Sequence, residues 1–178
     1  NAENLLDQTG LAIDGTYKAD DEVQATFLQV KGSYFLAIGY PDSAKSCFYQ
    51  SINRRLSANG KNDTNLHYAY NKLGNLYIAL SNYDSAFICH NVALDLSLNK
   101  KNQVNYLTAS SYQNVGISAH LKGDFQLAES CYKKSLELKE KLFKPGDPAL
   151  AKIYANLGKF YTDLSKYNAE TKQASILT

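Results

Sequence analysis

A repeat with a period of 42 residues constrains the fold of this chain more than any other feature of its sequence. Similar residues recur at this spacing along most of the 178 residues. Five columns show it: Gly32, Gly74, Gly116 and Gly158; Leu28, Tyr70, Tyr112 and Tyr154; Phe35, Tyr77, Ala119 and Tyr161; Pro41, Tyr83, Phe125 and Tyr167; Ala44, Ala86 and Ala128. A fixed period of this length is typical of arrays whose stacked units share a continuous core. We therefore predict a repeat protein.

Each unit has the pattern of two helices joined by a tight turn, which we call helix A and helix B. Apolar residues on both sides of Ser81 recur at spacings of three, four and seven, which places them on one helical face. A small residue divides every unit: Gly39, Ser81, Gly123 and Ser165. Helix stop and start signals separate the units, as where Asp147 can cap a helix that begins at Pro148. Each unit is thus predicted to be a helical hairpin.

These boundaries predict one all-α array of about nine helices over residues 1–178. The predicted repeats are residues 25–58, 67–100, 109–142 and a partial fourth repeat at 151–178. Ala2 and Leu6 lie 42 residues before Ala44 and Phe48, so residues 1–13 are predicted to form helix B of a preceding repeat or a cap. The fourth repeat departs from the pattern at Glu170, where alanine is expected.

The motif residues resemble those of the tetratricopeptide repeat (TPR) family. The second unit reads Tyr70-x-x-Leu73-Gly74-x-x-Tyr77, and the third reads Gly123-x-Phe125-x-x-Ala128-x-x-x-Tyr132. The usual period of the family is about 34 residues. The longer period seen here is similar to that of kinesin light chains and of many bacterial regulatory proteins. The resemblance implies a right-handed superhelical solenoid of antiparallel helix hairpins.

Composition and charge exclude several other classes of protein. Apolar residues make up 44% of the chain and charged residues 20%, which is a globular balance. The net charge of +2 is too small to predict a nucleic acid or an anionic membrane as partner, and no apolar run could span a bilayer. The chain begins at Asn1 and has no methionine, so we expect a processed form or a segment of a larger protein. The compartment is not predicted beyond a soluble segment on the cytoplasmic or periplasmic side.

Cysteine and histidine positions favour packing over chemistry. Cys47, Cys89 and Cys131 occupy one repeat column, and equivalent positions of stacked hairpins lie about 10 Å apart, beyond the roughly 7 Å that a disulfide allows. His90 falls in the column of Phe48 and Tyr132 and is also predicted to pack. We find no motif for metal binding, nucleotide binding or nucleophilic catalysis. The chain is therefore expected to have no metal, no cofactor and no enzyme activity.

The resemblance also implies where a partner would bind, because helix A lines the concave groove in this family. The corresponding residues are Asn71, Lys72, Asn75, Gln113, Asn114, Ile117, His120, Lys152, Asn156 and Lys159, with Gln29, Ser33, Leu36, Ile78 and Thr162 in the same columns. Asparagine and glutamine both donate and accept hydrogen bonds, so they could pair with a peptide backbone of any sequence. The alternative is that these side chains only solvate an exposed helix face.

These features predict a scaffold module that binds a protein or peptide, as an extended segment or a partner helix. It would be part of a larger signalling or regulatory protein, of the type found in bacteria. The alternative is a structural module that forms homo-oligomers through the exposed ends of its array.

Overall fold

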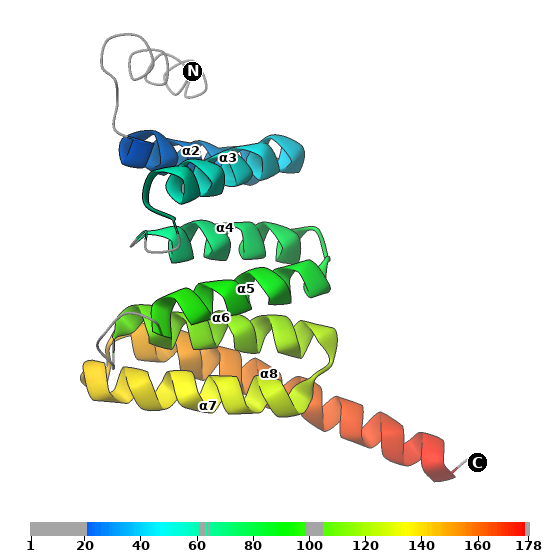
Figure 1. The fold of residues 1–178 in the computed structure, drawn as a ribbon. Coiled ribbons are helices and arrows are strands. Elements are labelled where there is room, and N and C mark those ends of the chain that lie inside the picture. The colour runs from blue at the N-terminus through cyan, green and yellow to red at the C-terminus, as the bar shows by residue number, and fades with distance from the viewer. Residues whose placement is uncertain (1–20, 61–62, 64, 99–104, 177–178) are drawn as a thin grey trace. The chain divides into compact units, whose positions relative to one another are not determined.

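The computed structural model describes residues 21–60, 63, 65–98 and 105–176 (Figure 1). Within these ranges the fold is all-helical and no strand occurs, as predicted. The helices are α2 (Asp21–Ala37), α3 (Pro41–Asn59), α4 (Leu66–Ala79), α5 (Tyr83–Leu98), α6 (Tyr106–Lys122), α7 (Phe125–Leu142) and α8 (Pro148–Ile176). They fall into two compact units, Asn1–Leu96 and Ser97–Thr178, which we call unit 1 and unit 2 and describe separately. No helix in the described ranges has both the length and the apolar content needed to cross a membrane.

Tight turns close three hairpins, α2–α3, α4–α5 and α6–α7, at the small residues that the sequence predicted. Gly39, Ser81 and Gly123 have φ angles of 85°, 56° and 83°, in the left-handed region that reverses the chain after a helix. In two of the hairpins the following residue caps helix B, because Asn82 accepts a hydrogen bond from the Ser85 amide and Asp124 accepts one from the Leu127 amide. In the first hairpin Tyr40 makes no side-chain cap, and Pro41 begins the helix. The hairpin interpretation is confirmed for these repeats.

The glycine column is the point of closest approach between the two helices of each hairpin. Gly32 faces the Phe48 ring, Gly74 faces the His90 ring and Gly116 faces the Tyr132 ring. A Cβ atom at Gly116 would lie 2.9 Å from Cδ1 of Tyr132, closer than such contacts occur. The helix B ring therefore packs directly on the helix A backbone, and His90 is a packing residue, as predicted.

A second column fixes the axial register of the hairpins. The Ser51 hydroxyl donates to the carbonyl oxygen of Ala25 at 2.7 Å, and the Ser135 hydroxyl donates to that of Ala109 at 2.7 Å. Both bonds join helix B to helix A with the same 26-residue separation. A slip of either helix in these two hairpins would leave a buried hydroxyl without its partner, which would cost stability.

The three cysteines are free thiols and all are buried. Burial raises the pKa of the Cys89 thiol to about 11, and burial also raises the pKa of Cys47 and Cys131. These thiols are therefore protonated near neutral pH, and their role as small packing residues is confirmed.

The expected count of about nine helices is wrong for the described residues, which form seven. The helix predicted at residues 1–13 lies outside the described residues. The turn predicted at Ser165 does not form, because α8 continues through it for 29 residues. Lys166 occupies the column of Tyr40, Asn82 and Asp124, and a lysine side chain cannot cap a helix N-terminus. Tyr40 makes no side-chain cap either, but Pro41 follows it and begins α3, whereas Tyr167 follows Lys166.

The continuous α8 leaves the fourth glycine of the column without its partner ring. No atom of another element lies within 4 Å of the position that a Cβ of Gly158 would take. In the other repeats this space is filled by helix B. Gly158 thus keeps the repeat pattern while its side of the helix is open.

We predict opposite effects of the same substitution at two glycines of this column. Gly116→Leu should lower the free energy of unfolding by about 3 kcal/mol, because the new side chain would overlap the Tyr132 ring. Gly158→Leu should leave it unchanged or raise it by up to about 1 kcal/mol, since leucine favours helix more than glycine does. Urea denaturation followed by circular dichroism measures both. Equal destabilisation by the two substitutions would contradict this packing.

Candidate functional site

The ten predicted binding residues lie in both units. Asn71, Lys72 and Asn75 lie on α4 in unit 1, where Asn71 is half-buried and the other two are exposed. The other seven lie on α6 and α8 in unit 2. Because the units are described separately, the candidate site is built from the residues of unit 2 alone.

One predicted column points into its hairpin and not outward. The Gln29 side-chain amide donates to the Ser51 hydroxyl on α3, and Gln113 accepts a hydrogen bond from the Lys139 ammonium on α7. Gln113 is only 3% exposed. It is therefore not available to a partner at the surface, which corrects the prediction for this residue. Neighbouring positions of a helix differ in direction by about 100°, so Asn114 can face solvent while Gln113 faces helix B.

Lys139 is a buried cation that the sequence interpretation missed. Its ammonium bonds to Gln113 and lies 3.4 Å from the carbonyl oxygen of Ala149. Burial, together with the positive charge of Lys152, lowers its pKa to about 8. The repeat pattern offered one indication of this buried cation, because Lys139 shares a column with Arg55. Arg55 is buried in unit 1 and bonds to Asp63 at 3.3 Å.

His120 packs between helices of unit 2 at the edge of the predicted groove. Its ring centroid lies 5.4 Å from that of Phe160 and 5.9 Å from that of Phe125. Its Nε2 atom lies 3.3 Å from an Asp163 carboxylate oxygen on α8. Burial lowers the pKa of His120, and the carboxylate of Asp163 partly opposes this shift. The residue joins α6 to α8 and presents little surface to a partner.

The remaining side chains form the candidate site, which we call the α6–α8 face: Asn114, Ile117, Lys152, Asn156 and Lys159. Lys152 and Lys159 are exposed, while Asn114, Ile117 and Asn156 are half-buried. Asn114 and Asn156 occupy the same repeat column, one on each helix.

The Asn156 amide is the least satisfied group of this face. Its nitrogen atom is shielded from solvent and donates no hydrogen bond to any group in the part of the chain that the structure describes. Buried polar atoms in native proteins nearly always have a partner. A ligand could accept a hydrogen bond from this amide if the half-buried side chain turned outward, and that bond would remove a cost present in the free protein.

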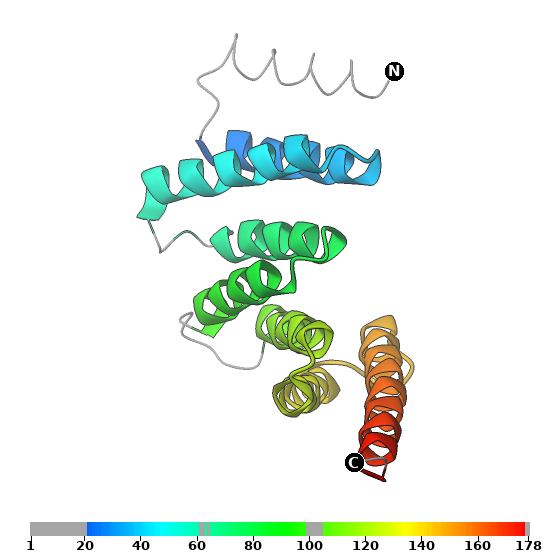
Figure 2. The same cartoon turned by 90° about the vertical axis from the view of Figure 1, so that its right-hand side faces the viewer.

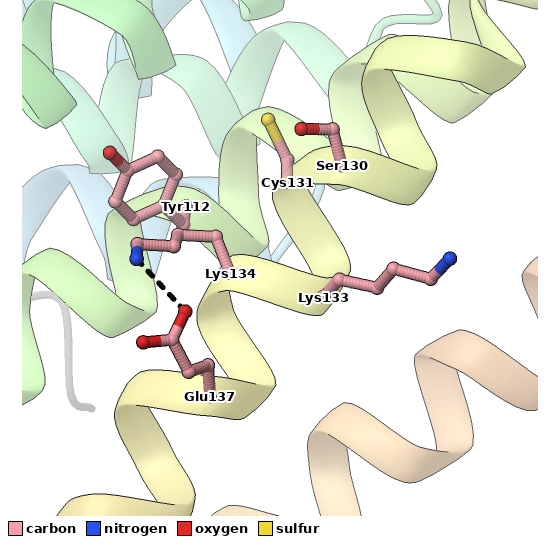
Figure 3. A pocket seen from close by; sticks show the side chains of 6 residues that line it. All are labelled: Tyr112, Ser130, Cys131, Lys133, Lys134 and Glu137. Carbon is pink, nitrogen blue, oxygen red and sulfur yellow. Dashed lines mark hydrogen bonds and ion pairs between the residues drawn. The ribbon is translucent and has the colours of Figure 1, made fainter.

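A separate pocket of about 420 Å³ lies on unit 2 between α6 and α7. Figure 3 shows its lining: Tyr112, Ser130, Cys131, Lys133, Lys134 and Glu137. Both lysines are paired, Lys134 with Glu137 at 2.9 Å and Lys133 with Glu129 at 2.8 Å. Hydrogen bonds from Lys141 and Lys134 lower the pKa of Glu137 to about 2, so it cannot act as a general acid near pH 7. The raised pKa of Cys131 likewise disfavours a thiolate nucleophile.

Side chains that bind metals do not gather in the described ranges. No group of three or more histidine, cysteine, aspartate or glutamate residues is placed there to hold an ion. The site that the geometry offers is thus a polar surface with two lysines and two asparagines.

Comparison with known proteins relates part of the chain to a known family. Residues 107–170 match the family Tetratricopeptide repeat. No curated protein matches the chain in sequence. Among solved structures, the repeats of a proposed kinesin light chain of Podosopora anserina match with a TM-score of 0.74 and 12% identity, over 95% of this chain and 80% of that one.

Two further structures show the same fold. BtubC (BKLC) from P. vanneervenii matches with a TM-score of 0.67 and 18% identity, over 81% of this chain. The chain spans only 61% of the length of that structure. The first TPR of Spaghetti (RPAP3), bound to the HSP90 peptide SRMEEVD, matches with a TM-score of 0.59 and 20% identity, over 82% of this chain and 98% of that one. At these identities the likeness concerns the fold alone.

We predict that Lys139 makes stability depend on pH. Its pKa is lower in the folded chain, at about 8, than its ordinary value of 10.5. Between these values the unfolded chain binds one proton more, so the free energy of unfolding rises with pH, by on the order of 3 kcal/mol in total. Below pH 8 the proton is held in both states and the cost of burial is constant.

The measurement is urea denaturation of the wild type and Lys139→Met at several pH values between 7 and 11. The difference in the free energy of unfolding between the wild type and Lys139→Met should change steadily between about pH 8 and pH 10.5. The other titrating groups are common to both chains, so their contributions cancel in this difference. Lys144→Met, at an exposed lysine, should keep the pH dependence of the wild type. A constant difference between the wild type and Lys139→Met would show that Lys139 does not titrate differently on folding.

Proposed function

We propose that the chain is a protein- or peptide-binding module of the tetratricopeptide-repeat type and that its ligand binds the α6–α8 face. The observation that carries the proposal is the pair Asn114 and Asn156, which lie in one column on two neighbouring helices, with the Asn156 amide nitrogen lacking a partner among the described residues. Amide side chains spaced along a surface suit an extended peptide, whose backbone offers donors and acceptors at regular intervals.

The charge of the α6–α8 face favours an acidic ligand. Lys152 and Lys159 are exposed on α8 beside the two asparagines, and Asp163 is engaged by His120. An extended segment that carries carboxylates would pair with the lysines while its backbone pairs with the asparagines. The Spaghetti structure in complex with an HSP90 peptide supports a peptide ligand, since it has the same fold.

We also propose that the chain has no catalytic activity of its own. The candidate face has no acid, base or nucleophile arranged for catalysis, and the pocket beside Cys131 contains a protonated thiol and paired charges. Its place in a larger signalling or regulatory protein of bacterial type is a further proposal. It rests on the resemblance of the 42-residue repeats.

The test is binding to an array of immobilised heptapeptides that differ in net charge. We expect the wild type to prefer acidic peptides, and Asn114→Ala combined with Asn156→Ala to weaken binding about tenfold or more, because each lost hydrogen bond costs about 0.5–1.5 kcal/mol. The loss should not depend on peptide side chains, since the asparagines contact the backbone. Lys152→Gln combined with Lys159→Gln should instead remove the preference for acidic peptides.

Asn168→Ala is the matched control, because Asn168 lies exposed on α8 outside the candidate face. It should bind as the wild type does. If the asparagine double variant unfolds at the same temperature and binds equally well, these side chains only solvate an exposed helix face and the proposal fails.

A further inference from the structure

Another pocket of unit 2, which we call the α7–α8 pocket, lies where α7 ends and α8 begins. The chain reverses direction between these helices (Figure 1), and Figure 2 shows α8 leaving the connection as one continuous helix. The pocket has a volume of about 350 Å³, at the small end of the range of about 300–1,000 Å³ that is usual for ligand sites. It is lined by Glu140, Phe143, Pro145, Gly146, Leu150 and Tyr154. A pocket of this size suits one side chain of a partner better than a whole cofactor.

The carboxylate of Glu140 is the one charged group of this lining, and it forms no ion pair within the described ranges. The other two carboxylates of α7, those of Glu129 and Glu137, are paired with lysines at 2.7 to 2.9 Å. Glu140 instead accepts a hydrogen bond from the Tyr154 hydroxyl at 3.0 Å. This bond holds the carboxylate at the pocket and leaves its negative charge without a counter-charge.

Two aromatic rings in the lining are suited to a cation. Phe143 packs edge-on against Tyr106 of α6, with ring centroids 5.8 Å apart, and this contact holds its ring in place. Tyr154 is 51% exposed, and its side chain lines the pocket. The face of an aromatic ring attracts a cation that lies within about 6 Å of its centroid. The chain makes this contact itself, since the Lys31 ammonium lies 5.7 Å from the centroid of the Phe35 ring.

The helix ends beside the pocket also favour a cation. The C-terminus of α7 has a partial negative charge, which attracts positive groups. The N-terminus of α8 has the opposite sign, but Asp147 caps it and accepts a hydrogen bond from the Ala149 amide at 2.8 Å. The exposed Lys144 does not line the pocket. The charges around the pocket therefore favour a cation over an anion or a neutral group.

We propose that the α7–α8 pocket binds the side chain of an arginine of a partner protein. A guanidinium group is planar, so it can stack on an aromatic ring of the lining while it donates hydrogen bonds to the Glu140 carboxylate. A lysine ammonium is a more strongly hydrated point charge and would gain less from the ring. Tyr154 and Asn156 differ in direction by about 200° on α8, so this pocket and the α6–α8 face are separate sites. Either proposal can therefore fail while the other holds.

An NMR titration of the full, isotope-labelled chain tests this assignment. The probes are the N-acetyl amides of arginine, of lysine and of citrulline, which has nearly the shape of arginine but no charge. The arginine probe should shift the backbone amide signals of Gly146 and Tyr154, with a Kd on the order of 1 mM for a single side chain. The citrulline probe should bind about tenfold more weakly, because its hydrogen bonds to Glu140 are not charge-assisted. The lysine probe should bind about threefold more weakly.

Glu140→Gln separates the charge of the pocket from its shape. Glutamine can still accept the hydrogen bond from Tyr154, but the arginine probe should bind about tenfold more weakly. Tyr154→Leu removes one ring and should weaken binding about threefold. Glu170→Gln is the matched control, because it removes the same charge at an exposed position of α8 outside the pocket and should bind as the wild type does. The replaced side chains are exposed, so all three variants should unfold at the temperature of the wild type.

Three results would overturn the assignment. The first is that millimolar concentrations of the arginine probe leave the signals of Gly146 and Tyr154 in place. The second is a citrulline or lysine probe that binds as tightly as the arginine probe. The third is a Glu140→Gln chain that unfolds at the temperature of the wild type and binds the arginine probe as tightly.

Discussion

The contact between a helix A glycine and a helix B ring is the interaction on which the rest of this structure depends. It brings the two helices close enough for Ser51 and Ser135 to bond to carbonyl oxygens of the facing helix. The same approach buries the cysteines and His90. Because the ring fills the space over the glycine, hairpins of this kind hide one side of helix A and leave another side for solvent. The location of a binding surface therefore follows from the location of the glycines.

The hairpins were predictable because their signals are local and repeated. A glycine or serine after helix A, an oxygen-bearing cap at Asn82 or Asp124 and a 42-residue spacing define them without knowledge of any distant contact. The fourth repeat was not predictable in the same way. It keeps Gly158 and Ser165, but Lys166 cannot cap a new helix, and no proline follows it as Pro41 follows the uncapped Tyr40.

The candidate site was predicted only in part, because a repeat column does not show whether its side chains face a neighbouring helix or solvent. Asn114, Lys152, Asn156 and Lys159 lie at or near the surface, whereas Gln113 lies one position away and is buried against Lys139. Glutamine is as common on surfaces as asparagine, so the residue type did not indicate that Gln113 is buried. The buried lysine in the column of Arg55 was the available signal, since a cation inside a hairpin needs an oxygen partner on the facing helix.

Asn114 and Asn156 are proposed to face a ligand, while Gln113 is part of the packing. Side-chain amide resonances in an NMR titration with a mixture of acidic heptapeptides test it most directly, because they report on each of these groups separately. The amide signals of Asn114 and Asn156 should shift with peptide concentration, while those of Gln113 and Asn168 should stay in place. Shifts at Gln113 or Asn168 with none at Asn114 and Asn156 would contradict it.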